Sequence, residues 1–261
     1  MDTGLVLSGG GFRGIAHVGV IKALEEFGIV PTHIAGTSSG AIVGALYAAD
    51  LSYQEIMEFL KQVNIFSIYK YARSKPGFVD SEKFYEEFSK ILPGDNFSTL
   101  KIPLIITATD VLDGTLKTFE DGQLIRPILA SAAFPGVFTP VKIENSHYID
   151  GGTLNNFPVD LIRHKCERLF GVYVNPFRRI GIDELKHSYN VLERAYQIRS
   201  ANSSVSKFRD CDVLIIPKNM HKYGTFSIKD MNTIFELGYQ GALEALKTYN
   251  SNDTEKIKIS D

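Results

Sequence analysis

The first 50 residues contain two short apolar segments, each of which runs into a glycine-containing turn and then into a helical pattern. Leu5–Leu7 is followed by three consecutive glycines and by Ile15–Phe27, whose apolar residues recur at helical spacing before Gly28. His33–Ala35 is followed by a second tight turn and by Ala41–Ala49, which is nearly all apolar. Strands that alternate with buried helices predict an α/β fold, a mainly parallel central sheet sandwiched by helices.

The rest of the chain continues this alternation. Asp113-Gly114 and Glu144-Asn145-Ser146 each separate two β-branched or apolar runs and predict hairpins. Ser52 and Ser81 stand at the expected N-caps of two amphipathic helices. We expect helices over Ser52–Val63, Ser81–Leu92, Glu184–Lys207 and Lys229–Lys247, and strands over Ile102–Asp110, Thr115–Phe119, Val141–Ile143, His147–Ile149, Arg168–Val174 and Asp212–Ile216.

Domain organisation follows from the absence of any low-complexity linker or internal repeat in the sequence. We therefore expect a single domain over residues 1–261. The last dozen residues, Asn250–Asp261, are polar and charged and are expected to form a flexible tail.

Composition excludes several classes of protein. With 28 Lys and Arg against 30 Asp and Glu, the formal net charge is −2, which argues against nucleic acid as a partner. The longest apolar runs, Ile42–Ala49 and Ile102–Val111, are shorter than the roughly 18 residues of a membrane span. The N-terminus lacks a basic leader, and Cys166 and Cys211 have no metal or redox spacing. These features predict a cytoplasmic protein without disulfides.

The first chemical motif is Gly9-Gly10-Gly11-Phe12-Arg13-Gly14, between a strand and a helix. It fits G-x-G-x-x-G, but the second strand ends in Ala35-Gly36-Thr37, without the acidic residue that would hold a ribose. Ile15 stands where a P-loop needs lysine. The loop is therefore expected to point backbone N–H groups at an anion, and a nucleotide-binding or regulatory module remains an alternative.

The second motif is Gly36-Thr37-Ser38-Ser39-Gly40, again between a strand and a helix. G-x-S-x-G in this setting predicts a nucleophile elbow, with Ser38 in a strained conformation and its hydroxyl exposed at a helix N-terminus. Ser39 is expected to cap the helix that follows.

The third motif is Asp150-Gly151-Gly152, directly after an expected strand. Alone it is turn chemistry, but a serine nucleophile needs a base, and a carboxylate at a strand end can serve.

The three motifs, in this order, resemble those of the patatin-like phospholipase family. Two flanking stretches are similar as well, Ser131-Ala132-Ala133-Phe134-Pro135 and Asn155-Asn156-Phe157-Pro158. The resemblance covers Gly4–His164 and implies a patatin-like three-layer architecture. Residues 4–164 would form the catalytic core, and residues 165–249 would complete the same domain.

The resemblance also implies a mechanism. Ser38 would attack an ester carbonyl and Asp150 would accept its proton, as a dyad without histidine. The loop Gly9, Gly10, Gly11, Phe12, Arg13 and Gly14 would form the oxyanion hole, Gly36 and Gly40 would shape the elbow, and Gly151 and Gly152 would follow the aspartate. Arg13 could stabilise negative charge or a lipid phosphate, or support the loop through an ion pair.

Histidines offer a different catalytic reading. His164, His187 and His221 all follow Asp150, so the Ser–Asp–His order of an α/β-hydrolase is formally possible. The elbow lies early for that fold, after the second strand, and His17 is expected to pack or hydrogen-bond near the glycine loop.

No cofactor is required by this chemistry, and we expect no metal site. Asp110, Asp113, Glu120 and Asp121 cluster near a hairpin but lack ligand spacing, and they are expected to be solvated turn residues.

The sequence therefore predicts a hydrolase that cleaves fatty-acyl esters of phospholipids, lysophospholipids or related lipids. A thioesterase or short-ester hydrolase without lipid preference is the alternative enzyme. Phe134, Val137 and Phe138 suit an acyl pocket, and Asn64–Asp80 is either an interfacial lid or a packed connector. Any contact with a membrane is expected to be peripheral.

Overall fold

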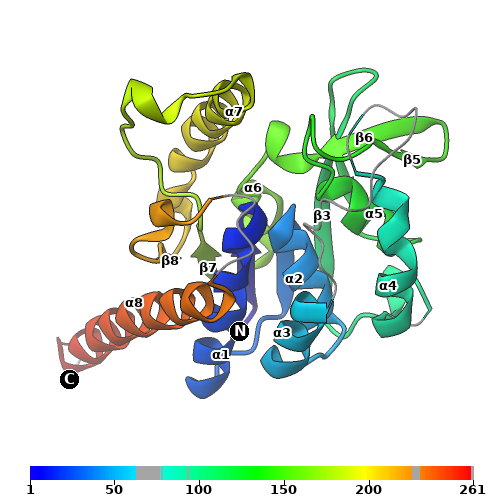
Figure 1. Ribbon diagram of the computed structural model, residues 1–261. Helices are drawn as coiled ribbons and strands as arrows, with labels where there is room; N and C mark the ends of the chain where they lie inside the picture. The colour runs from blue at the N-terminus through cyan, green and yellow to red at the C-terminus, as the bar shows by residue number, and fades with distance from the viewer. Residues whose placement is uncertain (63–76, 78, 93, 225–229, 260–261) are drawn as a thin grey trace.

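The computed structural model describes residues 1–62, 77, 79–92, 94–224 and 230–259. One eight-stranded sheet forms its centre, in the order β5-β6-β3-β2-β1-β7-β8, with β4 paired to β3 (Figure 1). The strands are β1 Thr3–Leu7, β2 His33–Thr37, β3 Leu104–Asp110, β4 Leu116–Phe119, β5 Val141–Ile143, β6 Ser146–Asp150, β7 Arg168–Val172 and β8 Val213–Ile215. The path from β3 to β8 is parallel, and β4, β5 and β6 are antiparallel. The expected mainly parallel α/β sheet is confirmed.

Helices cover both faces of this sheet. The helices are α1 Ile15–Glu26, α2 Ser39–Ala48, α3 Tyr53–Gln62, α4 Tyr85–Ile91, α5 Ile125–Ser131, α6 Val159–Ile162, α7 Ser188–Val205 and α8 Met231–Ile259. Leu5 and Leu7 point into the larger core, which includes apolar residues of α1, α2 and α8, whereas Val6 points into a smaller core under α6. No described helix is both long enough and apolar enough to span a membrane.

Both hairpins lie where the turn signals place them. β3 and β4 pair antiparallel around Asp113-Gly114, and β5 and β6 pair around the Glu144-Asn145 turn. β6 then pairs antiparallel with β3, so that Asp150 lies opposite Ala108. This second pairing brings the third motif to the edge of the parallel strands, beside the turn that follows β2.

Several helix ends differ from the sequence prediction. Ser39 is the first residue of α2 and makes no capping hydrogen bond, so the expected cap at Ser39 is wrong. The segment after Val79 is capped by Asp80, which accepts from the Glu82 N–H, because Ser81 instead donates to the Thr139 carbonyl. The helix expected from Glu184 begins at Ser188, after a short 3₁₀ turn at Ile182–Glu184. α8 extends to Ile259, past the start of the expected tail.

Ser52 caps α3 as expected. Its hydroxyl accepts from the Glu55 N–H at 3.3 Å, and the Glu55 carboxylate accepts from the Ser52 N–H at 2.9 Å. Serine and glutamate three residues apart thus satisfy each other's backbone donors in a capping box.

Replacing Ser52 by alanine should lower the free energy of unfolding by about 1 kcal/mol, because the Glu55 N–H loses its acceptor. Urea unfolding followed by circular dichroism measures this. Gln54→Ala, in the same exposed turn but outside the capping box, should change stability much less. Equal losses in the two variants would contradict the cap.

Candidate active site

Ser38 stands in a sharp turn between β2 and α2. Its φ of 55° and ψ of −124° lie in a region that residues with side chains rarely adopt. A Cβ on Gly36 would lie 2.5 Å from the Gly40 carbonyl oxygen, and one on Gly40 would lie 2.2 Å from the Leu7 carbonyl oxygen. Both flanking glycines are therefore required by close backbone packing, as the elbow prediction expects.

Buried hydroxyl groups hold this turn. The Ser38 N–H donates to the Ser131 hydroxyl at 2.7 Å, and Ser131 is fully buried. Thr37 shares a 2.7 Å hydrogen bond with Thr107 and donates to the Asn155 carbonyl at 2.9 Å. Both flanking stretches of the sequence thus contact the elbow: Ser131 through its side chain and Asn155 through its backbone. This gives each stretch a physical role that the sequence alone does not specify.

Asp150 lies at the end of β6, and its carboxylate is close enough to the Ser38 side chain for that hydroxyl to influence its pKa. The Gly152 N–H donates to its Oδ1 at 2.7 Å, and the side chain is almost completely buried. Burial raises the pKa of Asp150 from 3.8 to about 6, although the Ser38 hydroxyl and the hydrogen bonds from Gly152 and Tyr196 oppose the rise. The structure thus brings the second and third motifs together around one serine and one carboxylate.

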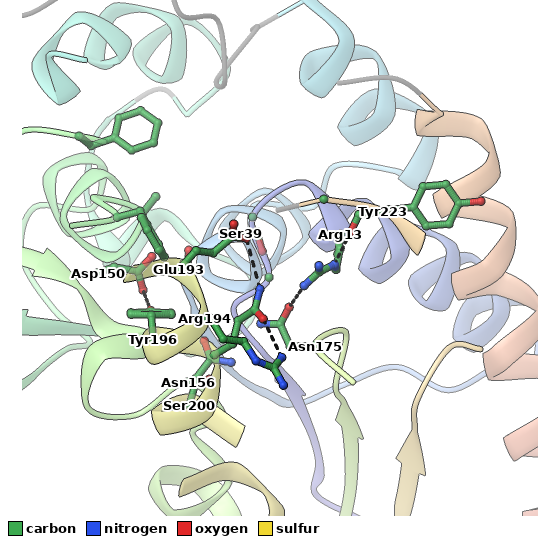
Figure 2. Close-up of a pocket in the computed structure, with 18 of the residues that line it drawn as sticks. Arg13, Ser39, Asp150, Asn156, Asn175, Glu193, Arg194, Tyr196, Ser200 and Tyr223 are labelled. Atoms are coloured by element: carbon green, nitrogen blue, oxygen red, sulfur yellow. Dashed lines mark hydrogen bonds between the residues drawn. The ribbon is translucent and has the colours of Figure 1, made fainter. Parts of the chain in front are cut away.

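Tyr196, on α7, also contacts this carboxylate. Its hydroxyl donates to Asp150 Oδ1 at 3.1 Å (Figure 2), and its ring packs 4.7 Å from the Phe134 ring. A Cβ on Gly152 would lie 2.1 Å from the Tyr196 hydroxyl, so glycine is needed for this approach. Burial and the Asp150 charge raise the pKa of Tyr196 well above its ordinary value, which keeps the hydroxyl protonated as a donor.

Sequence reasoning missed Tyr196. It lies in the C-terminal third, outside every recognised motif, and a tyrosine on a helix carries no signal of its own. Only the packing of α7 onto the turn Gly151–Thr153 brings it to the site.

The glycine loop runs along the same edge. The Gly9 N–H donates to the Asn156 carbonyl at 3.1 Å, and the Gly9 carbonyl accepts from the Asn175 side chain at 2.8 Å. The N–H of Gly9 is therefore already hydrogen-bonded within the protein. Gly10 and Gly11 line the cavity beside Ser38, and Gly11 has a φ of 57°. An oxyanion hole at this loop stays a prediction.

Arg13 ties the glycine loop to the C-terminal half. Its Nε donates to the Tyr223 carbonyl at 2.8 Å and its guanidinium donates to the Asn175 side chain at 2.9 Å (Figure 2). Burial lowers the pKa of Arg13, while the Glu193 carboxylate raises it. The sequence left two roles open for Arg13, stabilisation of negative charge and support of the loop. These contacts favour support of the loop: the guanidinium donates to two neutral oxygens, and the Glu193 carboxylate lies nearby.

Histidine does not contact Asp150 in the described residues. His17 is fully buried and hydrogen-bonds the Ser8 carbonyl at 2.8 Å, and burial lowers its pKa to about 4. His164 and His187 are exposed on the surface. His221 is exposed as well and lines the far side of the cavity, without a hydrogen bond to the carboxylate.

A cavity of about 250 Å³ opens onto Ser38 and Asp150 and has two unlike walls. One wall is apolar and comes from α2, the 3₁₀ turn Ser81–Phe84, α4, α5 and the loop after α5: Ile42, Phe84, Phe88, Ile128, Leu129, Ala132, Phe134 and Phe138. The other comes from the C-terminal third and is largely polar: Asn175, Arg178, Glu184, Asn190, Glu193, Arg194, Gln197, His221 and Tyr223. Of the three residues suggested for an acyl pocket, Phe134 and Phe138 line this cavity, and Val137 is not among the lining residues.

Two further expectations concern residues around the site. Of Asn64–Asp80, only Gly77, Val79 and Asp80 are described, so the lid prediction lies outside the described residues. Asp110 is 8% exposed and accepts hydrogen bonds from Ser146 and from the Leu112 N–H, so its expected solvation is wrong. Within the described ranges, no three His, Cys, Asp or Glu side chains are placed to hold a metal ion.

In sequence, comparison with known proteins gives three similarities. Residues 5–162 match the sequence model of a family described as patatin-like phospholipase. The chain is 26% identical over 300 residues to lysophospholipase NTE1 of Scheffersomyces stipitis, covering 99% of this chain and 19% of that protein. It is 36% identical over 157 residues to an uncharacterized NTE family protein of Mycobacterium tuberculosis, covering 59% and 44% of the two chains.

In structure, the chain is similar to VipD from Legionella pneumophila. The TM-score is 0.54 at 14% sequence identity, and the similarity covers 95% of this chain and 67% of that one. This likeness concerns the fold. The chain spans about a fifth of the length of the fungal relative it matches.

Replacing Asp150 by asparagine should stabilise the folded chain at pH 8. The folded pKa of about 6 exceeds the ordinary 3.8, so the folded state carries a penalty that is absent below pH 4 and complete above pH 6. Removing the charge should raise the free energy of unfolding by about 1–3 kcal/mol at pH 8 and by little at pH 4.

Asp110→Asn is the matched control for this titration. Hydrogen bonds from Ser146 and from the Leu112 N–H lower the pKa of Asp110, so removing that charge should destabilise at pH 8. Urea unfolding at the two pH values tests both signs. A loss of stability in Asp150→Asn at pH 8 would contradict the burial penalty.

Proposed function

The chain belongs to the patatin-like phospholipase family, and we propose that it is a serine acyl-ester hydrolase acting on fatty-acyl esters of lipids. Ser38 is the nucleophile and Asp150 the base. One observation carries the proposal: Ser38, held in a strained turn, lies beside the buried Asp150 carboxylate, and both line a cavity with an apolar wall.

In the first half of the reaction, the Ser38 oxygen attacks the ester carbonyl carbon and its proton passes to Asp150. The tetrahedral intermediate places its negative oxygen at the N–H groups of Gly10 and Gly11. One such donor typically contributes about 2.7–4 kcal/mol of transition-state stabilisation. Collapse of the intermediate expels the alcohol, which takes the proton from Asp150, and leaves the acyl group on Ser38.

In the second half, water attacks the acyl-enzyme. Asp150 accepts a proton from the water as the water oxygen bonds to the acyl carbon. The intermediate then collapses, the Ser38 oxygen leaves and takes that proton from Asp150, so that the fatty acid is released and the dyad is restored. A pKa of about 6 suits this work, because the carboxylate is a stronger base than an ordinary aspartate yet still ionised at neutral pH.

The two walls of the cavity support a lipid ester as the substrate class. The aromatic and aliphatic wall suits an acyl chain, and the polar wall suits the alcohol side of the ester. Relatives named lysophospholipases support phospholipids or lysophospholipids within this class. Because the chain spans only a fifth of those relatives, the activity of a longer protein is part of the same proposal.

The nucleophile can be tested with a fluorophosphonate probe and a p-nitrophenyl ester series. Ser38→Ala should abolish labelling and lower kcat/KM by about 10³-fold or more, and Asp150→Asn should lower it by at least about 10²-fold. Ser39→Ala is the matched control, because the Ser39 hydroxyl beside it has no hydrogen-bond partner in the described chain. It should keep both labelling and hydrolysis.

Outcomes of this experiment separate the alternatives. A preference for long acyl chains supports lipid esters, and activity confined to short chains would favour the esterase alternative. A folded wild-type chain that neither labels nor hydrolyses any ester would overturn the hydrolase proposal and favour the binding module.

The pH dependence tests the role of the carboxylate. Because Asp150 must be ionised to accept a proton, kcat/KM should fall as the pH drops through about 6. Tyr196→Phe removes a hydrogen bond that lowers the pKa of Asp150, so this acidic limb should move to higher pH. Tyr239→Phe removes a similar bond, to Glu26 at the surface, and should leave the profile unchanged. An unshifted limb in Tyr196→Phe would argue against this role.

A further inference from the structure

α7 is amphipathic in the reverse of the usual sense. The side that faces the rest of the chain carries Tyr196, Ser200 and Ser204, of which both serines are buried. The opposite side carries Val191, Leu192, Ile198 and Val205, which are 51%, 69%, 44% and 56% exposed. An ordinary surface helix turns its aliphatic residues inward. The outer side of α7 therefore exposes a stripe of aliphatic side chains to solvent, and these side chains are not part of the core.

Two further exposed apolar side chains precede α7 in the sequence. Phe177 and Ile182, on the segment that leads into α7, are 50% and 85% exposed. Of the twelve large apolar side chains that are exposed in the described chain, six thus lie between residues 177 and 205. We name this set the rim surface: Phe177, Ile182, Val191, Leu192, Ile198 and Val205. A concentration of this kind marks an interaction site more often than scattered exposed residues do.

The rim surface reaches the candidate active site at Phe177. Phe177 lines the cavity while half of its side chain is exposed, and the Arg194 guanidinium lies 4.0 Å above its ring. Arg194 also donates to the Arg178 carbonyl at 2.7 Å, so the loop and α7 form one unit. α7 lies beyond the ends of β7 and β8 (Figure 1).

The charge of this region differs in sign from that of the whole chain. Residues 176–205 contain five Arg and Lys against three Asp and Glu, whereas the chain as a whole has a net charge of −2. Arg178 pairs with Glu184, whereas Arg179 and Lys186 are exposed and form no ion pair in the described part of the chain. Exposed cations beside an aliphatic stripe suit a surface that is apolar beneath and anionic at its face.

We propose that the rim surface docks on a phospholipid bilayer that contains anionic lipids, and so presents the mouth of the cavity to lipid esters. The role of this docking, to bring lipid esters to the cavity, rests on the proposed hydrolase function. Binding to the bilayer itself does not require catalysis. A second copy of the chain would also cover aliphatic residues, but it would bring the same basic segment against itself. The excess of positive charge therefore favours an anionic lipid surface.

Docking can be measured with vesicles that the enzyme cannot cleave. The wild-type chain is sedimented with vesicles of ether-linked phosphatidylcholine, with and without 30% ether-linked phosphatidylglycerol. Val191→Gln/Leu192→Gln/Ile198→Gln should weaken binding at least about tenfold, because three side chains no longer enter the acyl region. Glutamine keeps the helix propensity of α7. Phosphatidylglycerol should strengthen binding, and 0.5 M NaCl should reduce that gain.

Val30→Gln is the matched control. Val30 is 67% exposed, close to the 69% of Leu192, but it lies between α1 and β2, at the end of the parallel strands opposite to Ser38. This variant should bind vesicles like the wild type. Hydrolysis of a soluble p-nitrophenyl ester should be unchanged in both variants, which also shows that they are folded. Leu192→Gln alone, as a milder change, should lose part of the binding.

Three other results would contradict the docking proposal and leave the proposed hydrolase function unaffected. Wild-type chain that cleaves the soluble ester but does not sediment with either vesicle excludes it, and so does a triple variant that binds like the wild type. A dimer seen by light scattering that the triple variant abolishes, with no vesicle binding, would assign the rim surface to self-association. Loss of soluble-ester hydrolysis in Ser38→Ala, by contrast, tests the hydrolase alone.

Discussion

At the carboxyl ends of the central strands, the chain packs so closely that glycine is required at three positions. The end of β1 lies against Gly40, the Ser38 turn folds over Gly36, and the Asp150 turn admits the Tyr196 hydroxyl at Gly152. Parallel strands bring β1 and β2 to the same edge, and the antiparallel pairing of β6 with β3 adds the carboxylate. The site depends on this convergence, because its serine and its aspartate come from strands far apart in sequence.

Holding the site has a cost in stability. The left-handed conformation of Ser38 costs of order 1–3 kcal/mol, and the buried Asp150 carboxylate adds a penalty that its raised pKa reflects. Hydrogen bonds from the surrounding elements help to offset both costs. Ser38 is anchored to buried Ser131 through its own N–H, and Asp150 to Ala133 through its N–H at 2.9 Å. The end of α5 and the residues that follow it therefore hold both Ser38 and Asp150 in place.

Local signals predicted what depends on local physics. Glycine spacing identified the elbow, and alternating apolar segments identified the sheet and both hairpins. Helix caps were predicted where nothing competes, as at Ser52, and missed where a tertiary hydrogen bond takes the serine, as at Ser81. The contacts of Arg13 with Asn175 and Tyr223, and of Tyr196 with Asp150, join segments with no sequence relation, and only the folded chain brings them together.

The reversed amphipathic character of α7 follows from the same conflict between local and tertiary demands. Helical periodicity would turn Val191 and Ile198 inward, but that rotation would withdraw Tyr196 from the carboxylate. The hydrogen bond to Asp150 and the outward aliphatic stripe are thus two consequences of one helix orientation. In water, this orientation exposes apolar surface beside the cavity, which is unfavourable. Contact with a lipid surface would remove that cost.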